Sequence, residues 1–239
     1  IQYAELQKKA IITAVNKGVL ILTGGPGTGK TTTLNGIINM FEKDFLKIAL
    51  CAPTGRAAQR MTEATGRTAT TIHRLLEVEW AENNRPEFRR NLRNPLDYQA
   101  IIVDEMSMVD IFLFSSLLDA LPFGCRLIMV GDSDQLPSVS PGNVLKDLID
   151  TGLIPVVQLK EIFRQSLESN IVRNAHAIVN GEQIETDYKD GDFYLLQRHF
   201  PLDAVRTIKD LCVKRLPDAY GFDPTTQIQV LSPSKKGET

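Results

Sequence analysis

The sequence has few cysteines, no long apolar run and almost no net charge, and each of these absences excludes a class of protein. Its three cysteines (Cys51, Cys125 and Cys212) lie far apart with no CxxC pair, which favours reduced core residues in a cytoplasmic protein. No apolar stretch reaches membrane-spanning length, and the N-terminus does not resemble a signal peptide, so we expect no membrane partner. The formal net charge of -2 argues against a uniformly basic binder but leaves a local basic groove open.

What the sequence does contain is an alternation of short apolar runs with segments of helical apolar spacing. Continuous apolar runs are typical of strands that are buried on both faces of a parallel sheet. The alternation therefore predicts a three-layer α/β fold with a mostly parallel sheet flanked by helices. We expect strands over 18–25, 47–53, 100–105 and 126–132, and helices over 3–15, 31–45, 54–66, 70–78 and 111–121.

The alternation changes at two places, which we interpret as an insertion and a domain boundary. Residues 76–98 are polar and contain Trp80 and four arginines, so they look like an excursion from the core. After Pro155 the pattern restarts, and we expect strands over 156–159, 192–196 and 226–233 and helices over 169–181 and 202–216. We therefore predict a first domain over 1–155 and the beginning of a second α/β domain over 156–239. Because the chain begins at Ile1 and ends in "LSPSKKGET", we expect a fragment of a longer protein.

Residues 24–31, "GGPGTGKT", fit the phosphate-loop pattern G-x-x-x-x-G-K-[ST] between an expected strand and an expected helix. The glycines let backbone N–H groups surround phosphates, and the helix N-terminus favours an anion. Lys30 can reach the β- and γ-phosphates, and the Thr31 hydroxyl can ligate Mg²⁺. The alternative is a glycine-rich turn that binds nothing. The predicted nucleotide-binding residues of this segment are Gly25, Pro26, Gly27, Thr28, Gly29, Lys30, Thr31 and Thr32.

Acidic and amide side chains follow the next two expected strands. Asp104 and Glu105 end the strand "AIIVDE", where the carboxyl ends of parallel strands face the ligand crevice. Asp104 would hold the magnesium, and Glu105 would be the base or orienter for the attacking water. Gln135 follows the strand "RLIMVGD" and could contact a γ-phosphate or the water and release it after hydrolysis. The alternative for Gln135 is a solvated turn.

Six blocks together resemble, in order, motifs I to IV of superfamily 1 DNA helicases. They are "GGPGTGKTTT", "APTGRAAQRM", "TIHRLL", "VDEMSMVD", "GDSDQLPSVSPG" and "LKEIFRQ". Three of these blocks are especially similar to the RecD-like branch, the exonuclease V alpha subunits and their stand-alone relatives. The resemblance implies a P-loop NTPase with a RecA-like motor domain and the start of a second one. It also implies an ATP-driven, 5′-to-3′ motor on single-stranded DNA and duplex junctions, with Mg²⁺ as cofactor.

The resemblance assigns roles to two further residues. Gln7 corresponds to the adenine-reading glutamine upstream of the phosphate loop, although an exposed helix residue is the alternative. Arg164 matches the motif IV arginine that reaches the γ-phosphate from the second domain, although a surface ion pair with Glu161 is the alternative. A role in DNA repair or recombination and partner subunits of a nuclease–helicase complex are also implied.

Candidate DNA contacts follow the strand over 47–53 and the turn before the helix over 70–78. The predicted residues are Pro53, Thr54, Gly55, Arg56, Thr71 and His73. Backbone N–H groups at a helix start grip phosphates without reading sequence, which suits a motor. Arg56 and Arg60 could instead be a solvated helix face, and His73 a packed histidine. The insertion occupies the slot of a strand-separating hairpin, in which Trp80, Phe88, Arg89 and Arg90 could meet bases or only pack the hairpin onto its domain.

Two rival functions remain open from the residues alone. A P-loop kinase would share the phosphate loop, but "GDSDQLP" and "EIFRQ" have no obvious role in it. A non-catalytic DNA-binding subunit would keep the fold without turnover. The intact Lys30, Asp104, Glu105 and Gln135 argue against it. Motifs V and VI of the family have no match here, so we expect this stretch alone to be nearly inactive.

Overall fold

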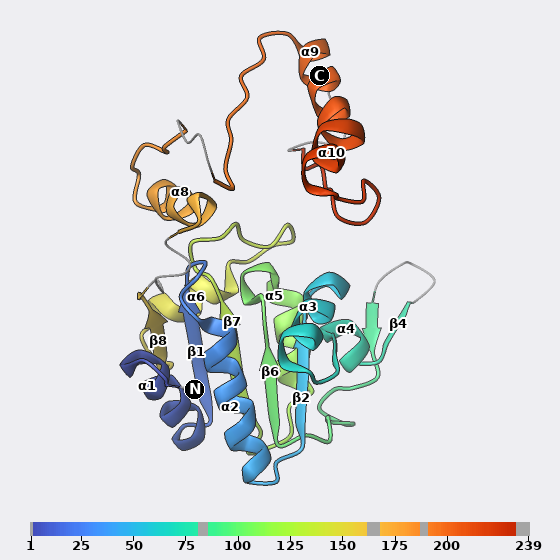
Figure 1. Cartoon of the computed structure of the whole chain (residues 1–239). Helices are drawn as coiled ribbons and strands as arrows, with labels where there is room; N and C mark the ends of the chain where they lie inside the picture. The colour runs from blue at the N-terminus through green and yellow to red at the C-terminus, as the bar shows by residue number, and fades with distance from the viewer. Residues whose placement is uncertain (1, 81–85, 162–167, 187–190, 233–239) are drawn as a thin grey trace. The chain divides into compact units, whose positions relative to one another are not determined.

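A computed structural model describes residues 2–80, 86–161, 168–186 and 191–232 of the chain. The chain divides into two compact units, residues 1–185 and residues 186–239. Figure 1 shows the sheet of the first unit with its helices. No helix in the described ranges is long and apolar enough to cross a membrane.

The first unit is built on a six-stranded sheet in which every pairing is parallel. The strands lie in the order β3-β2-β6-β7-β1-β8. Their bounds are β1 (Val19–Gly24), β2 (Ile48–Ala52), β3 (Ala69–Thr71), β6 (Ala100–Val103), β7 (Arg126–Gly131) and β8 (Val156–Leu159). All six carboxyl ends therefore open on one edge, where α/β sheets bind ligands.

Helices cover both faces of this sheet and confirm the predicted three-layer arrangement (Figure 1). One face carries α1 (Glu5–Asn16), α2 (Lys30–Lys43) and α3 (Gly55–Thr65). The other face carries α4 (Ile72–Leu75), the 3₁₀ turn η1 (Met106–Met108), α5 (Ile111–Asp119) and α6 (Val144–Asp150). Gly66 ends α3 in the left-handed conformation, with φ of 69°, which is why glycine serves as a helix stop.

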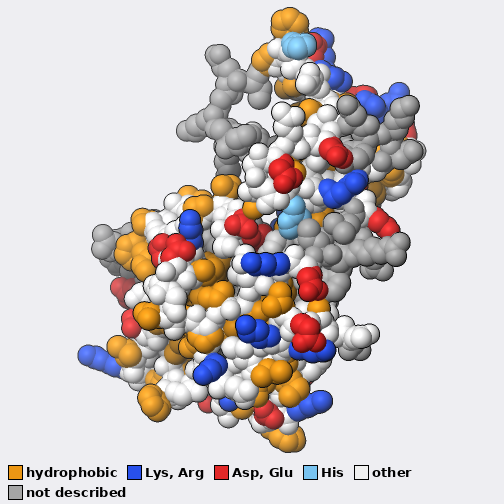
Figure 2. All heavy atoms as spheres, turned by 90° about the vertical axis from the view of Figure 1, so that its left-hand side faces the viewer, with side chains coloured by type: hydrophobic (Ala, Val, Ile, Leu, Met, Phe, Trp, Pro, Cys, Tyr) orange, Lys and Arg blue, Asp and Glu red, His pale blue; other side chains and the backbone are white. Residues whose placement is uncertain are grey.

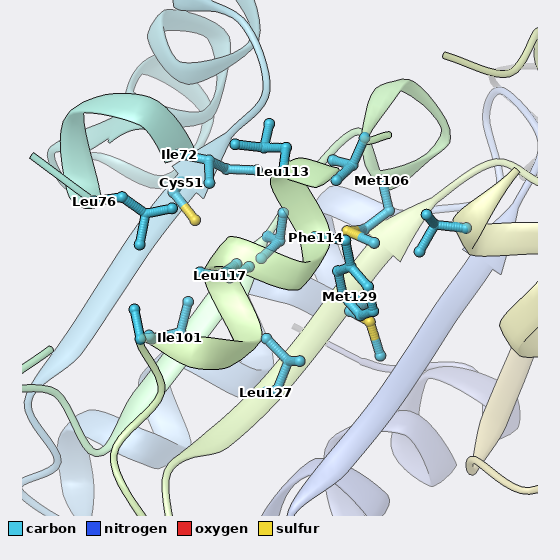
Figure 3. Close-up of a cluster of buried hydrophobic side chains, with 14 of the residues drawn as sticks. Cys51, Ile72, Leu76, Ile101, Met106, Leu113, Phe114, Leu117, Leu127 and Met129 are labelled. Carbon is cyan, nitrogen blue, oxygen red and sulfur yellow. The ribbon is translucent and has the colours of Figure 1, made fainter. Parts of the chain in front are cut away.

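Two apolar clusters hold the layers together, because successive strand residues point to opposite faces. Leu20 and Leu22 of β1 pack under α1 and α2, whereas Ile21 between them joins the cluster under α5. Figure 3 shows Leu113, Phe114 and Leu117 of α5 among side chains from the strands. Each fully buried side chain of this size stabilises the fold by about 1.5–3 kcal/mol.

The expectation that all three cysteines are reduced core residues is met in part. Cys51 is fully buried in the cluster under α4 and α5, and burial raises the pKa of its thiol to about 12. Cys125 and Cys212 are only partly buried, so just one of the three is a core residue. All three are free thiols.

The insertion forms an antiparallel hairpin of β4 (Val78–Trp80) and β5 (Pro86–Phe88). Phe88 packs against the core cluster under α5. Arg89 forms an ion pair with Glu79, and Arg90 forms one with Glu77 at 2.8 Å. These contacts support the interpretation that the base of the hairpin is packed onto its own domain. Residues 81–85 lie outside the described residues.

The region after Pro155 differs from the sequence-based expectation. The strand β8, expected to open the second domain, pairs in parallel with β1 of the first sheet. The helix α8 (Asn170–Val179) follows and belongs to the first compact unit, which ends at Glu185. The domain boundary near residue 155 stays a prediction. The assignment of the two parts to separate motor domains stays a prediction.

The described part of the second unit is helical. It contains α9 (Pro201–Asp210), a π-helical turn over Leu211–Arg215 and α10 (Leu216–Tyr220). The strands predicted over 192–196 and 226–233 are absent from its described residues, and none of those residues is buried. Apolar alternation produces a strand only where a neighbouring strand satisfies its backbone groups, and the described residues supply none.

Candidate functional site

The phosphate loop connects β1 to α2, as the pattern predicts. Gly27 and Gly29 have positive φ angles of 74° and 83°, a conformation that a side chain would strain. A Cβ atom on Gly24 would lie 2.7 Å from the Leu159 carbonyl oxygen of β8, so the loop also needs glycine for close packing. Thr28 is buried and donates its hydroxyl to the Gly25 carbonyl at 2.8 Å. Glycine at these positions and this hydrogen bond thus set the conformation of the loop.

Lys30 lies over its own loop. Its Nζ donates hydrogen bonds to the carbonyl oxygens of Gly24 and Gly25, the latter at 3.0 Å. The ammonium therefore occupies the hollow that the loop backbone encloses, where a phosphate would be held. A bound polyphosphate would replace these two carbonyls as the hydrogen-bond partner of the Lys30 ammonium. Thr31 and Thr32 follow in the first turn of α2, with Thr31 exposed.

Gln7 lies against the opposite end of the loop. Only 3% of its surface is exposed, and its Nε2 lies 3.4 Å from the Gly29 carbonyl oxygen. Its Oε1 accepts from the Ala4 amide at 3.0 Å, which fixes the orientation of the side chain. The alternative of an exposed helix residue is therefore wrong, and the adenine-reading role stays a prediction.

Asp104 and Glu105 follow β6 at the same edge of the sheet. The Asp104 amide donates to the Cys51 carbonyl at 2.9 Å, and its carboxylate accepts from the Glu105 amide at 2.9 Å. Burial raises the pKa of Asp104, although that amide and the nearby charge of Lys30 oppose the shift. Lys30 and Asp104 thus follow strands that end at the same edge of the sheet, as a phosphate and metal site requires.

Glu105 stands in an unusual backbone conformation. Its φ of 54° and ψ of 43° are left-handed, which few residues with a side chain adopt. Burial raises the pKa of its carboxyl, the charges of Asp104 and Asp132 raise it further, and Lys30 and Arg60 lower it. A partly buried carboxylate with a raised pKa is suited to accept a proton from water. Arg60 of α3 thus bears on this site, which the sequence did not indicate.

The loop after β7 lies between these groups, because β7 pairs with both β1 and β6. Asp132 is buried, and its carboxylate accepts from the Asp134 amide at 3.0 Å. The Ser133 amide lies 3.3 Å from the Thr23 hydroxyl of β1, which ties the loop to the strand before the phosphate loop. Asp132 is a site residue that sequence reasoning missed, although its block had been singled out.

Gln135 is exposed and lies on the turn that follows. Its Oε1 lies 3.5 Å from the Ser107 hydroxyl of η1, the long limit of a hydrogen bond. This contact connects the β7 loop to the segment that carries Asp104 and Glu105. The coupling role of Gln135 stays a prediction.

The predicted DNA contacts lie at the carboxyl ends of β2 and β3, on the same edge of the sheet. Thr54 caps α3 by accepting from the Ala57 amide at 3.2 Å. Thr71 caps α4 by accepting from the Arg74 amide at 3.1 Å. Pro53, Gly55 and Arg56 surround the start of α3, with Arg56 exposed. Both threonines thus have a structural role, worth about 1 kcal/mol each for such a cap.

The surroundings of His73 agree in part with the alternative that it is a packed histidine. Its ring lies 5.9 Å from the Phe88 ring, measured between centroids. Both line a cavity of about 610 Å³ that also includes Phe112 and Asp110 of the α5 start. His73 therefore contacts the hairpin while keeping a partly exposed edge. Arg164 lies outside the described residues.

The charge around the sheet is mixed. On the face that Figure 2 shows, Lys and Arg side chains are interspersed with Asp and Glu, so that face carries no continuous basic stripe. Among the residues that the structure describes, no group of three or more His, Cys, Asp or Glu side chains could hold a metal ion. The candidate metal ligands remain Thr31 and Asp104.

One contact with the phosphate loop comes from a residue that the sequence did not indicate. His176 of α8 places its Nε2 3.1 Å from the Pro26 carbonyl oxygen. It lies 150 residues along the chain from the loop, a separation that no local pattern can bridge.

Comparison with known proteins identifies the family. A profile described as an AAA domain matches residues 7–141. The chain is 44% identical over 164 residues to the ATP-dependent RecD2 DNA helicase of Deinococcus radiodurans. This match covers 69% of this chain and 22% of the relative. It is 41% identical over 167 residues to the RecBCD enzyme subunit RecD of Mycobacterium tuberculosis, covering 60% and 28%. The chain thus spans about a quarter of the length of these curated relatives.

Solved structures support the fold. A Bacteroides Pif1 bound to ssDNA has a TM-score of 0.53 at 20% identity, covering 88% of this chain and 56% of that chain. The Pif1 helicase from Candida albicans has a TM-score of 0.55 at 24% identity, covering 78% and 46%. Because the matched profile spans more than half of the residues, the chain belongs to the AAA domain family, and the curated proteins that it resembles are of the RecD type.

Proposed function

We propose that the protein is an ATP-dependent helicase or translocase that moves 5′ to 3′ on single-stranded DNA, acting in DNA repair or recombination. One observation supports this most directly. The phosphate loop, the Asp104–Glu105 pair and the Gln135 loop, which lie far apart in sequence, meet at one edge of the sheet. The similarity to RecD-type proteins over the same residues adds the DNA substrate. Other subunits of a nuclease–helicase complex are proposed partners, because some of these relatives are named as subunits.

ATP with Mg²⁺ is the proposed fuel. Lys30 would hold the β- and γ-phosphates, Thr31 and Asp104 would ligate the metal, and Glu105 would orient the water. Magnesium typically uses one or two carboxylates and shares the phosphates, so it needs no larger protein cage. Arg164 would add charge at the γ-phosphate from the second domain. Gln7 would contact the adenine beside Gly29.

Single-stranded DNA is proposed to cross the carboxyl ends of β2 and β3. Pro53, Thr54, Gly55, Arg56, Thr71 and His73 are the proposed contacts. Because the Thr54 and Thr71 hydroxyls already cap helices, the backbone amides beside them are better placed to bind phosphates. Such contacts would hold any sequence.

Gln135→Ala is expected to uncouple the motor. Gln135 contacts Ser107, which lies two residues beyond Glu105, so it is placed to relay the state of the γ-phosphate. We expect DNA-stimulated ATP hydrolysis to persist while unwinding falls much further. The matched control is Gln158→Ala, which changes an exposed glutamine on β8. The ratio of base pairs unwound to ATP consumed measures the effect. An equal loss of both activities would return Gln135 to the role of a turn residue.

Replacement of residues 81–85, which connect β4 to β5 in the sequence, by Asn-Gly is expected to impair duplex unwinding while sparing movement on single strands. The base of the hairpin is held by Phe88 and by the ion pairs of Arg89 and Arg90, so the shortened hairpin should still fold. Unwinding of a forked duplex and streptavidin displacement from a single strand separate the two activities. Equal loss of both would indicate a structural or general DNA-binding role.

Duplexes with a single-stranded tail at one end test the proposed function. The full-length protein with ATP and Mg²⁺ should unwind a 5′-tailed duplex and leave a 3′-tailed duplex intact, and DNA should stimulate its ATP hydrolysis. Unwinding from the 3′ tail would refute the polarity. Phosphate transfer to a small acceptor without stimulation by DNA would favour the kinase alternative.

A further inference from the structure

His176 lies on the phosphate loop although it comes from α8, beyond the sheet. Its Nε2 is 3.1 Å from the Pro26 carbonyl oxygen. A Cβ atom built on Gly25 would lie 2.7 Å from the ring atom Cε1. The ring therefore packs directly on the Gly25–Pro26 segment, and a side chain at position 25 would displace it.

The chemistry of the contact fixes the position of one proton. A carbonyl oxygen can only accept a hydrogen bond, so the Nε2 atom of His176 must carry the hydrogen. The neutral ring then has a free acceptor at Nδ1, and the charged ring has a second donor there. Either form holds Pro26 in place through the Nε2 bond.

The contact lies at one particular end of the loop. The Lys30 ammonium, which serves the β- and γ-phosphates, rests on the carbonyls of Gly24 and Gly25. His176 contacts Gly25 and Pro26, next to that ammonium. Gln7 contacts Gly29 at the other end. His176 thus borders the place of the terminal phosphate and lies away from the proposed adenine contact.

The helix that carries His176 is held at its start and at its middle. Ser169 caps its start by accepting from the Val172 amide at 3.2 Å. In the middle of the helix the Asn174 side chain exchanges two hydrogen bonds with the Glu185 backbone, at 2.9 and 3.0 Å. Glu185 is the last residue of the first compact unit. The same helix therefore contacts both the phosphate loop and the last residue of the first unit.

We propose that His176 is a positioning residue for the terminal phosphate of ATP, which orients Gly25 and Pro26 and links loop occupancy to α8. This inference rests on the proposed nucleotide site. It predicts that His176 contributes more to the binding of a triphosphate than to that of a diphosphate, because the segment it orients lies at the end of the loop away from the proposed adenine contact.

The test compares the affinities of the full-length protein for ADP and for a non-hydrolysable ATP analogue, measured by titration with fluorescent nucleotides. His176→Ala should weaken binding of the ATP analogue roughly three- to tenfold, the loss expected for one hydrogen bond, and change ADP binding little. His176→Gln should restore most of the affinity, because its amide N–H can replace Nε2–H. His176→Phe, which keeps the ring without the donor, should not.

His199→Ala, an exposed histidine change in the second unit, is the matched control and should behave as wild type. The proposal would be overturned if His176→Ala weakened the binding of both nucleotides equally or left the binding of both unchanged. Full recovery of affinity in His176→Phe would overturn it as well. A wild-type protein that binds the ATP analogue but unwinds no DNA would refute the helicase function alone, since the comparison of affinities needs no turnover.

Discussion

Replacement of Lys30 by alanine in the full-length protein is expected to abolish ATP hydrolysis while leaving single-stranded DNA binding largely unchanged. The ammonium is the one cation that the phosphate loop itself supplies, and it already lies in the hollow of the loop on the Gly24 and Gly25 carbonyls. Loss of a group that stabilises transition-state charge costs on the order of 10² to 10³ in rate, and here the ground-state contact is lost as well. Steady-state hydrolysis with and without DNA measures the effect.

The matched control is Lys43→Ala, which removes an exposed lysine from the last turn of the same helix. It should leave hydrolysis and DNA binding intact. DNA binding by the Lys30 variant is measured by fluorescence anisotropy, since the proposed DNA contacts lie at β2 and β3 rather than at β1. Near-normal turnover by the Lys30 variant would show that this loop is not the active site.

Glu105→Gln is expected to preserve Mg-ATP binding and to slow hydrolysis by a factor on the order of 10² to 10⁴, because it keeps the shape and removes the base. Burial and the charges of Asp104 and Asp132 raise the pKa of the Glu105 carboxyl. The active carboxylate is therefore protonated at a higher pH than that of an ordinary glutamate. The rate of wild-type hydrolysis should fall as the pH drops through this raised pKa. The rate of the Glu105→Gln variant should not show this fall at acid pH.

Asp104→Ala provides the contrast, because a metal ligand should affect binding of Mg-nucleotide itself. Glu63→Gln, an exposed change on α3, is the control for the loss of a carboxylate. If Glu105→Gln weakened nucleotide binding as much as Asp104→Ala does, the division of roles between the two carboxylates would be wrong.

The elements of the first sheet could be predicted because their signals are local. Strands buried on both faces are continuously apolar, and the phosphate-loop pattern requires a strand before it and a helix after it. The carboxyl ends of parallel strands share an edge, so the meeting of Lys30 with Asp104 followed from the fold class. The sequence could not separate a capping role of Thr54 and Thr71 from the predicted DNA contact, since a threonine at a helix start suits a cap and a phosphate contact equally.

The remaining features depend on contacts between distant segments. The partner of β8 could not be chosen from "VVQL", because a short apolar strand fits the edge of either of two sheets. His176 has the sequence character of a helix residue, and only the folded chain brings it to Pro26. The strand predictions at 192–196 and 226–233 were wrong for the described residues, since alternation cannot show whether a neighbouring strand is present.

The left-handed backbone of Glu105 sets its proposed catalytic role against stability at a single residue. A residue with a side chain held at such φ and ψ angles costs on the order of 1 kcal/mol or more, and burial of its carboxylate adds to the cost. Glycine would relieve both penalties at once. Directed evolution for thermal tolerance alone would therefore favour Glu105→Gly, and its most heat-resistant products would bind ATP without consuming it.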